Sequence, residues 1–222
     1  MEDKKTALII EGGGQRGVFS FGITDTFINR AYDPFDIYIG VSNGVAVLYW
    51  YLIRETDNNL EKMLFAAKGD YLSYKNIFTG KDIFKFHQMF KDGEKMFKPN
   101  IENIKNNIDG KDYIAVVTDA IEANAEYYSF GEDEWMSKMI ASGTLPVLVK
   151  TPSLINGRRK FDGGIVDPLP AKKAYEMGAK KIIIIRTYEK KFRRKLKLEN
   201  YIGALLLREY PKLRKALLEH DK

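Results

Sequence analysis

Short apolar runs alternate with longer segments of helical periodicity in the first quarter of the chain. The runs 6–10 and 36–39 predict buried strands, and segments 18–30 and 45–53 carry apolar residues at helical spacing. The order strand, helix, strand, helix predicts a βαβα unit, whose strands are parallel and whose connecting helices cover the sheet. We therefore expect an α/β fold: a mainly parallel central sheet with helices on both faces.

The remaining pattern extends this arrangement toward the C-terminus. Residues 112–118 and 125–130 predict a strand hairpin, 157–161 a short exposed strand or turn, and 181–186 a last core strand. Helices are expected at 57–68, 99–108, 133–141, 170–177, 199–208 and 211–218. Segment 69–97 is looser and rich in aromatic residues, which fits either the packing of short helices or an apolar pocket or lid.

A glycine-flanked serine follows the second strand. Gly40-Val41-Ser42-Asn43-Gly44 matches G-x-S-x-G, the turn that lifts a serine hydroxyl out of a sheet edge. The helix that begins behind it favours a developing negative charge. Ser42 is therefore a candidate nucleophile.

A second glycine turn, Gly12-Gly13-Gly14-Gln15-Arg16-Gly17, follows the first strand. It satisfies G-x-G-x-x-G, but the acidic residue that a dinucleotide site needs would be Asp36, which begins the second strand instead of ending it. A phosphate loop is excluded because no Lys-Ser or Lys-Thr pair follows. The remaining interpretation is an oxyanion hole built from free backbone N–H groups, with Arg16 to reinforce it or to anchor a substrate phosphate.

The general base for Ser42 is not an obvious histidine. His87 lies in the aromatic segment, where a structural role is favoured, and His220 lies in a polar tail. A carboxylate is the alternative, and Asp162 is the natural candidate because Gly163 and Gly164 let the backbone approach another element closely. Asp-Gly-Gly is also ordinary turn chemistry.

Taken together, G-G-G-x-R-G, G-x-S-x-G and D-G-G in this order resemble the patatin-like phospholipase family. The resemblance spans residues 7–186 and includes 141–146, similar to A-S-x-x-x-P, and 162–170, similar to the segment that leads into the next helix. It implies a patatin-like α/β/α sandwich and a Ser–Asp dyad acting on acyl esters of lipids. It also implies a catalytic domain at 1–188 followed by a basic, helical extension at 189–222.

Carried over by position, the resemblance makes Ser42 the nucleophile and Asp162 the base. The oxyanion hole would comprise the backbone at Gly12, Gly13 and Gly14 and the N–H of Asn43, with Arg16 nearby. Supporting motif positions are Gly17, Gly40, Gly44, Gly163 and Gly164.

Two departures from the family pattern leave an alternative open. Asn43 stands where small residues are common, and its side chain is placed to crowd or hydrogen-bond an oxyanion. The chain is also short after its last strand, so we expect it to lack a C-terminal region of longer relatives and, with it, one wall of the pocket. A weakly active or non-catalytic lipid-binding relative is the first alternative, and a nucleotide-binding protein that uses the Gly12 turn is the second.

Composition and charge restrict the partners. The chain has no cysteine, no apolar run of membrane-spanning length and no cluster of metal-ligating residue types, so we expect no metal or cofactor and a cytoplasmic protein. The net charge is +6, concentrated near the end. A basic run there predicts either a solvated face or an electrostatic contact with anionic lipid or nucleic acid. The apolar residues interleaved with it favour a peripheral contact with a membrane surface, and we expect no nucleic acid partner. The run consists of Lys190, Lys191, Arg193, Arg194, Lys195 and Lys197.

Overall fold

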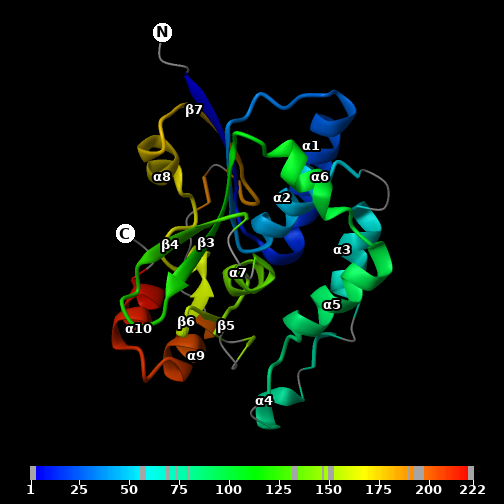
Figure 1. Cartoon of the computed structure of the whole chain (residues 1–222). Coiled ribbons are helices and arrows are strands. Elements are labelled where there is room, and N and C mark those ends of the chain that lie inside the picture. The colour runs from blue at the N-terminus through cyan, green and yellow to red at the C-terminus, as the bar shows by residue number, and fades with distance from the viewer. Residues whose placement is uncertain are drawn as a thin grey trace.

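A seven-stranded sheet with helices on both faces forms the centre of the molecule (Figure 1). The structure, a computed structural model, describes residues 4–55, 59–68, 71–73, 75–79, 81–131, 135–146, 148–149, 153–189, 191–192 and 198–219. The strand order is β5-β6-β3-β2-β1-β7, and β4 also pairs with β3. This confirms the predicted α/β class.

Four neighbouring strands are parallel and carry most of the core. They are β1 (Lys5–Ile10), β2 (Ile37–Val41), β3 (Asp112–Asp119) and β7 (Ala179–Ile185). In the register, Ile9 lies opposite Ile39 of β2 and Ile184 of β7, and Ile39 opposite Ile114 of β3. β1, β2 and β3 lie inside the sheet and are mostly apolar, as strands buried on both faces need to be, whereas the edge strand β7 is only partly buried.

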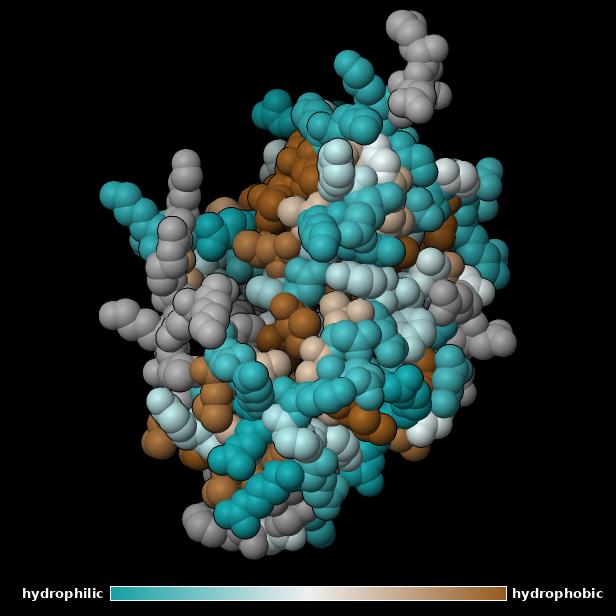
Figure 2. All heavy atoms as spheres, turned by 90° about the vertical axis from the view of Figure 1, so that its left-hand side faces the viewer, coloured by the Kyte–Doolittle hydropathy of each residue, from teal (hydrophilic) through white to brown (hydrophobic). Residues whose placement is uncertain are grey.

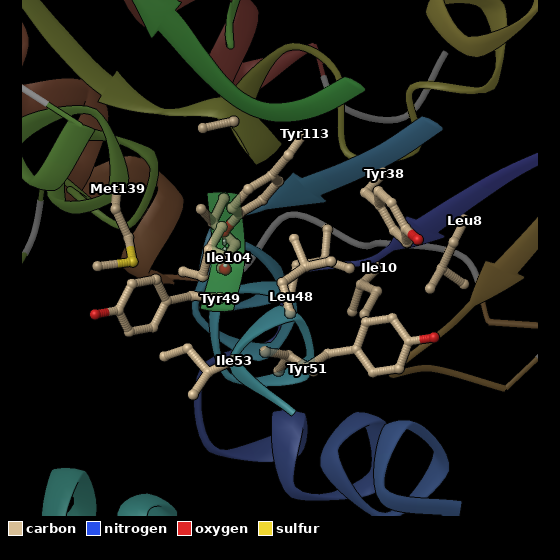
Figure 3. Close-up of a cluster of buried hydrophobic side chains, with 14 of the residues drawn as sticks. Leu8, Ile10, Tyr38, Leu48, Tyr49, Tyr51, Ile53, Ile104, Tyr113 and Met139 are labelled. Carbon is tan, nitrogen blue, oxygen red and sulfur yellow. Dashed lines mark hydrogen bonds between the residues drawn. The ribbon is translucent and has the colours of Figure 1, made fainter. Parts of the chain in front are cut away.

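Each strand of this parallel core sends alternate side chains to opposite faces. Leu8 and Ile10 join a cluster with α1 (Gly17–Asn29), α2 (Asn43–Ile53), α6 (Ile101–Asn107) and α7 (Trp135–Ser142). Figure 3 shows strand side chains from this cluster gathered around Leu48 of α2. Ala7 and Ile9 point to the other face, which α8 (Ala171–Glu176) covers on the opposite side of the sheet in Figure 1.

Antiparallel strands complete the sheet beyond β3. β4 (Ala125–Ser129) forms the predicted hairpin with β3, and β6 (Arg158–Asp162) pairs with the far end of β3 and with β5 (Ser153–Ile155). The prediction of an exposed element at 157–161 was wrong for its second half, because Lys160 is 1% exposed and Phe161 4%. Lys160 is buried as an ion pair: its ammonium donates to Asp119 and Glu126, each at 2.6 Å.

The other helices lie outside the sheet layers. α3 (Asn59–Ala67), α4 (Asn76–Thr79) and α5 (Phe86–Phe97) form an arm beside α2 in Figure 1. α9 (Leu198–Leu206) and α10 (Pro211–Leu218) contribute Ala204 and Leu213 to a buried cluster with Phe161 of β6. The division at 188 stays a prediction. Within the described residues, no helix is long and apolar enough to cross a bilayer.

Candidate active site

Ser42 occupies a strained turn between β2 and α2. Its backbone has φ 55° and ψ −130°, a left-handed conformation that is rare for a residue with a side chain. The turn passes so close to β1 that a Cβ at Gly44 would stand 2.2 Å from the carbonyl oxygen of Ile10. Only glycine fits there, and the sharp turn presents the serine at the carboxyl ends of the parallel strands, where α/β folds place their ligands.

The hydroxyl of Ser42 reaches a carboxylate 120 residues later in the chain. Ser42 Oγ donates a hydrogen bond of 2.6 Å to Asp162 Oδ2. The other carboxylate oxygen, Oδ1, accepts the N–H of Gly164 at 2.7 Å, and Asp162 is only 3% exposed. The two residues that the sequence singled out as nucleophile and base are therefore in direct contact.

The backbone of Asp162 is held on both sides. Its N–H donates to the carbonyl oxygen of Thr144 at 2.8 Å, and its own carbonyl oxygen accepts the hydroxyl of Thr118 at 2.8 Å. The next residue, Gly163, packs so tightly that a Cβ would stand 2.3 Å from the carbonyl oxygen of Val116. The carboxylate therefore projects from a backbone with little freedom to shift.

The glycine loop 12–14 lies directly against the serine. A Cβ at Gly12 would stand 2.6 Å from Ser42 Cβ, and the Gly12 carbonyl oxygen accepts the hydroxyl of Thr187 at 2.6 Å. Within the described part of the chain, the N–H groups of Gly13, Gly14 and Asn43 donate no hydrogen bond. These three N–H groups belong to the two turns that meet at Ser42, and within the described residues no protein acceptor takes them up.

The Asn43 side chain turns to the glycine loop. Its Nδ2 donates to the carbonyl oxygen of Gly14 at 2.9 Å and lies 1.9 Å from where a Cβ at Gly17 would stand. The amide group is therefore engaged in bracing the turn between β1 and α1. Its predicted effect on an oxyanion remains a prediction.

The Arg16 side chain contacts the aromatic ring of Tyr188. Its guanidinium lies over the ring of Tyr188, 4.0 Å from the centroid, and also bonds to the Tyr188 hydroxyl. Tyr188 in turn stacks on Phe192 at 4.0 Å between centroids. Arg16 thus joins the start of α1 to the segment after β7, and a role toward a substrate phosphate stays a prediction.

Sequence reasoning missed the side chain that hydrogen-bonds to the backbone of Ser42. The buried Ser142 accepts the N–H of Ser42 at 2.8 Å and donates to the carbonyl oxygen of Val116 at 2.6 Å. The A-S-x-x-x-P resemblance at 141–146 pointed to this segment without indicating the role of its serine. Thr118 and Thr187 carried no signal in sequence, because strand pairing and loop closure bring them to the site.

The remaining candidates lie elsewhere. His87 is exposed on α5, and His220 falls outside the described residues. Asp36 accepts the N–H of Thr6 at 2.7 Å at the amino end of β2, whereas the glycine loop lies at the carboxyl end of β1. An acidic residue at that end of the sheet cannot serve a nucleotide held by the Gly12 turn. Among the described residues, no group of three or more His, Asp or Glu side chains is placed to hold a metal.

A cavity of about 400 Å³ opens beside Ser42 and runs between α2 and the α3–α5 arm. Its lining is predominantly apolar and includes much of the aromatic segment, so those aromatic residues form pocket wall as well as packing. The two charged side chains in the lining are Lys62, whose ammonium lies 4.0 Å over the ring of Trp50, and Glu94. Principal lining residues are Ala46, Tyr49, Trp50, Met63, Phe65, Leu72, Phe84, Phe86, Met89, Phe90, Phe97, Met136, Met139, Leu145 and Leu148.

Tyr49 contributes a hydroxyl group to the wall of this cavity. Burial, and then the nearby Glu94 carboxylate, raises the pKa of the Tyr49 hydroxyl well above its usual range. The shift favours the neutral hydroxyl over the phenolate. The cavity next to the serine suits an apolar group better than a charged one.

Comparison with known proteins places the chain in a family. A family model described as "Patatin-like phospholipase" matches residues 8–175. The chain is 25% identical over 185 residues to "Uncharacterized protein YjjU" of Escherichia coli (strain K12), an alignment covering 82% of this chain and 52% of that protein. The chain thus spans about half the length of this curated relative. A solved structure, VipD from Legionella pneumophila, aligns with a TM-score of 0.42 at 14% identity, covering 75% of this chain and 47% of that one.

Proposed function

Because the chain belongs to the patatin-like phospholipase family, a family of lipid acyl hydrolases, we propose that it hydrolyses fatty-acyl esters through a dyad of Ser42 and Asp162. The observation that carries this proposal is the 2.6 Å hydrogen bond from Ser42 Oγ to Asp162 Oδ2. A carboxylate at this distance is within reach to accept the serine proton directly, so the chemistry needs no histidine.

In the first half of the proposed reaction, Ser42 Oγ attacks the ester carbonyl carbon while its proton passes to Asp162. The carbonyl oxygen becomes an oxyanion and accepts hydrogen bonds from the N–H groups of Gly13, Gly14 and Asn43, at the positive end of α2. The intermediate then collapses by breaking the bond to the alcohol oxygen. The departing alcohol takes the proton from Asp162, leaving an acyl group on Ser42.

In the second half, water replaces the alcohol. The water oxygen attacks the acyl carbon while Asp162 accepts a proton from the water. The same N–H groups donate hydrogen bonds to the oxyanion that forms. Breaking the bond to Ser42 Oγ releases the fatty acid, and the proton on Asp162 returns to the serine. During both halves the acyl chain would lie in the apolar cavity, whose volume of about 400 Å³ is within the usual range for small-molecule sites.

Covalent labelling tests the dyad directly. A fluorophosphonate probe should label the folded protein, and Ser42→Ala should abolish both labelling and hydrolysis of p-nitrophenyl acyl esters. Asp162→Asn should slow both by about 10²- to 10⁴-fold, the usual contribution of a general base. Asp167→Asn is the matched control, because Asp167 lies five residues later and bonds to the Tyr127 hydroxyl instead, at 2.7 Å. A folded wild-type protein that resists labelling would contradict the proposed dyad and favour the non-catalytic alternative.

The lipid nature of the substrate also suggests a membrane contact. The basic run at 190–197 would attract anionic head groups, and Lys191, the member of the run that the structure describes, is exposed. Lys190, Arg193, Arg194, Lys195 and Lys197 lie outside the described residues. Salt-sensitive binding to anionic vesicles is the expected result.

A further inference from the structure

Helix α9 carries apolar side chains on two faces. Its inner face packs through Ala204, which is 3% exposed, against Phe161 of β6. Its outer face consists of Leu198, Tyr201, Ile202 and Leu205, which are 74%, 55%, 43% and 53% exposed. We call these four residues the outer α9 face.

The spacing of the outer α9 face is that of one continuous helical stripe. Positions 198, 201, 202 and 205 follow the i, i+3, i+4, i+7 pattern that places side chains on one side of a helix. Isolated exposed leucines are ordinary on protein surfaces, whereas four large apolar side chains in contiguous turns mark a surface that binds something.

Charge indicates what this surface binds. Residues 189–222 contain eleven Lys and Arg against five Asp and Glu, which accounts for the whole net charge of +6, and residues 1–188 are neutral overall. An apolar helical stripe within the basic part of an otherwise neutral protein is complementary to an anionic lipid surface, which offers acyl chains beneath phosphate groups. A second copy of this chain would bring the same excess of positive charge against itself.

The position of α9 relates this surface to the candidate site. Phe161, on which α9 packs, directly precedes Asp162 in β6. Figure 1 shows α9 in the lower part of the molecule, toward which the parallel strands run, and Figure 2 shows hydrophobic side chains among hydrophilic ones at the surface at this height.

We infer that the outer α9 face inserts into the interface of an anionic lipid surface, and so docks the protein on a bilayer beside its active-site strands. The inference deepens the membrane part of the proposed function but does not require hydrolysis. Insertion would anchor the protein through apolar contact, in addition to the electrostatic attraction of the basic run.

The experiment measures binding of the Ser42→Ala protein to extruded vesicles, so that lipid hydrolysis cannot interfere. The vesicles contain phosphatidylcholine alone or with one third phosphatidylglycerol. Ile202→Asn/Leu205→Asn should weaken binding to the anionic vesicles at least tenfold, because burying each large aliphatic side chain changes an equilibrium constant by about that factor. Leu60→Asn/Leu64→Asn on α3 is the matched control: its two leucines lie one helical turn apart, are 62% and 48% exposed, and should leave binding as in the parent.

A label reports insertion independently of affinity. The chain has no cysteine, so Ile202→Cys gives a single site for an environment-sensitive fluorophore. Its fluorescence should rise and shift to the blue on anionic vesicles, whereas a label at Leu64→Cys should not respond. Circular dichroism and the thermal midpoint check that each variant is folded.

Three results would overturn the inference. One is equal vesicle binding by folded Ile202→Asn/Leu205→Asn and its parent. Another is equal binding to neutral and anionic vesicles. The third is a lipid-independent dimer that this double variant dissociates, which would make the outer α9 face an interface between copies. Since the parent lacks the Ser42 hydroxyl, none of these results bears on the proposed dyad.

Discussion

Asn43 offers the sharpest test of how the glycine loop is held, because two interpretations of it predict opposite effects. If its side chain crowds the oxyanion, Asn43→Ala should raise kcat/KM. If the amide braces the loop through its 2.9 Å bond to the Gly14 carbonyl oxygen, the same change should lower kcat/KM. The structure favours the second interpretation.

The magnitude follows from one hydrogen bond between neutral groups. Such a bond contributes about 0.5–1.5 kcal/mol. Without it, the population of the loop conformation that presents its N–H groups to the oxyanion would fall about two- to tenfold. We expect Asn43→Ala to lower kcat/KM for a p-nitrophenyl ester by that factor. Asn43→Asp should lower it further, because a carboxylate cannot donate to the Gly14 oxygen and repels a developing oxyanion.

The control is a similar bond far from the site. Asn103 on α6 donates through Nδ2 to the carbonyl oxygen of Ile53 at 3.1 Å, so Asn103→Ala loses a comparable contact and should leave kcat/KM unchanged. Steady-state kinetics with melting curves separate activity from stability. An increase in kcat/KM for Asn43→Ala would refute the bracing argument.

Three further predictions concern stability. Ser142→Ala removes the acceptor of the partly buried N–H group of Ser42. The change should lower the free energy of unfolding by about 1–3 kcal/mol, measured by urea titration. Gly44→Ala should prevent folding or abolish activity, because its Cβ would stand 2.2 Å from the Ile10 carbonyl oxygen, whereas Gly22→Ala, with open space around it in α1, should stabilise by up to about 1 kcal/mol. Burial would raise the pKa of Asp33, but hydrogen bonds from tyrosine and lysine and a nearby arginine outweigh it and lower this pKa below 3.8. Its contribution to stability is therefore present above about pH 4 and is lost as the pH falls through the folded-state pKa, so melting curves of Asp33→Asn should lack this acid-dependent part.

The sequence predicts the first βαβα unit well because its signals are local. Apolar runs mark β1 and β2, and the glycines around Ser42 mark the turn between β2 and α2. The pairing of Ser42 with Asp162 is different. The lack of a suitable histidine and the two glycines after Asp162 made it a candidate, but Asp-Gly-Gly is also ordinary turn sequence, and the family resemblance was needed to pair residues 120 positions apart.

Segment 157–161 shows where a prediction of exposure from local sequence fails. Gly157–Phe161 contains three consecutive basic residues, so its composition indicates exposure. Lys160 is nevertheless buried, because the antiparallel register of β6 on β3 brings it to Asp119. The direction of the Asn43 amide was likewise unpredictable, since it depends on how close α1 and α2 approach at Gly17. Such partners are fixed by tertiary packing.

The bond from Thr187 to the Gly12 carbonyl joins residues 175 apart, and it has a consequence for how the protein folds. Closing so long a loop costs chain entropy that is recovered only when the strands at both ends have paired, so contacts of this separation form late. A nascent chain can therefore form its first helices well before Thr187 contacts the glycine loop beside Ser42. Upon refolding, reactivity toward a fluorophosphonate should therefore recover more slowly than the far-ultraviolet helical signal.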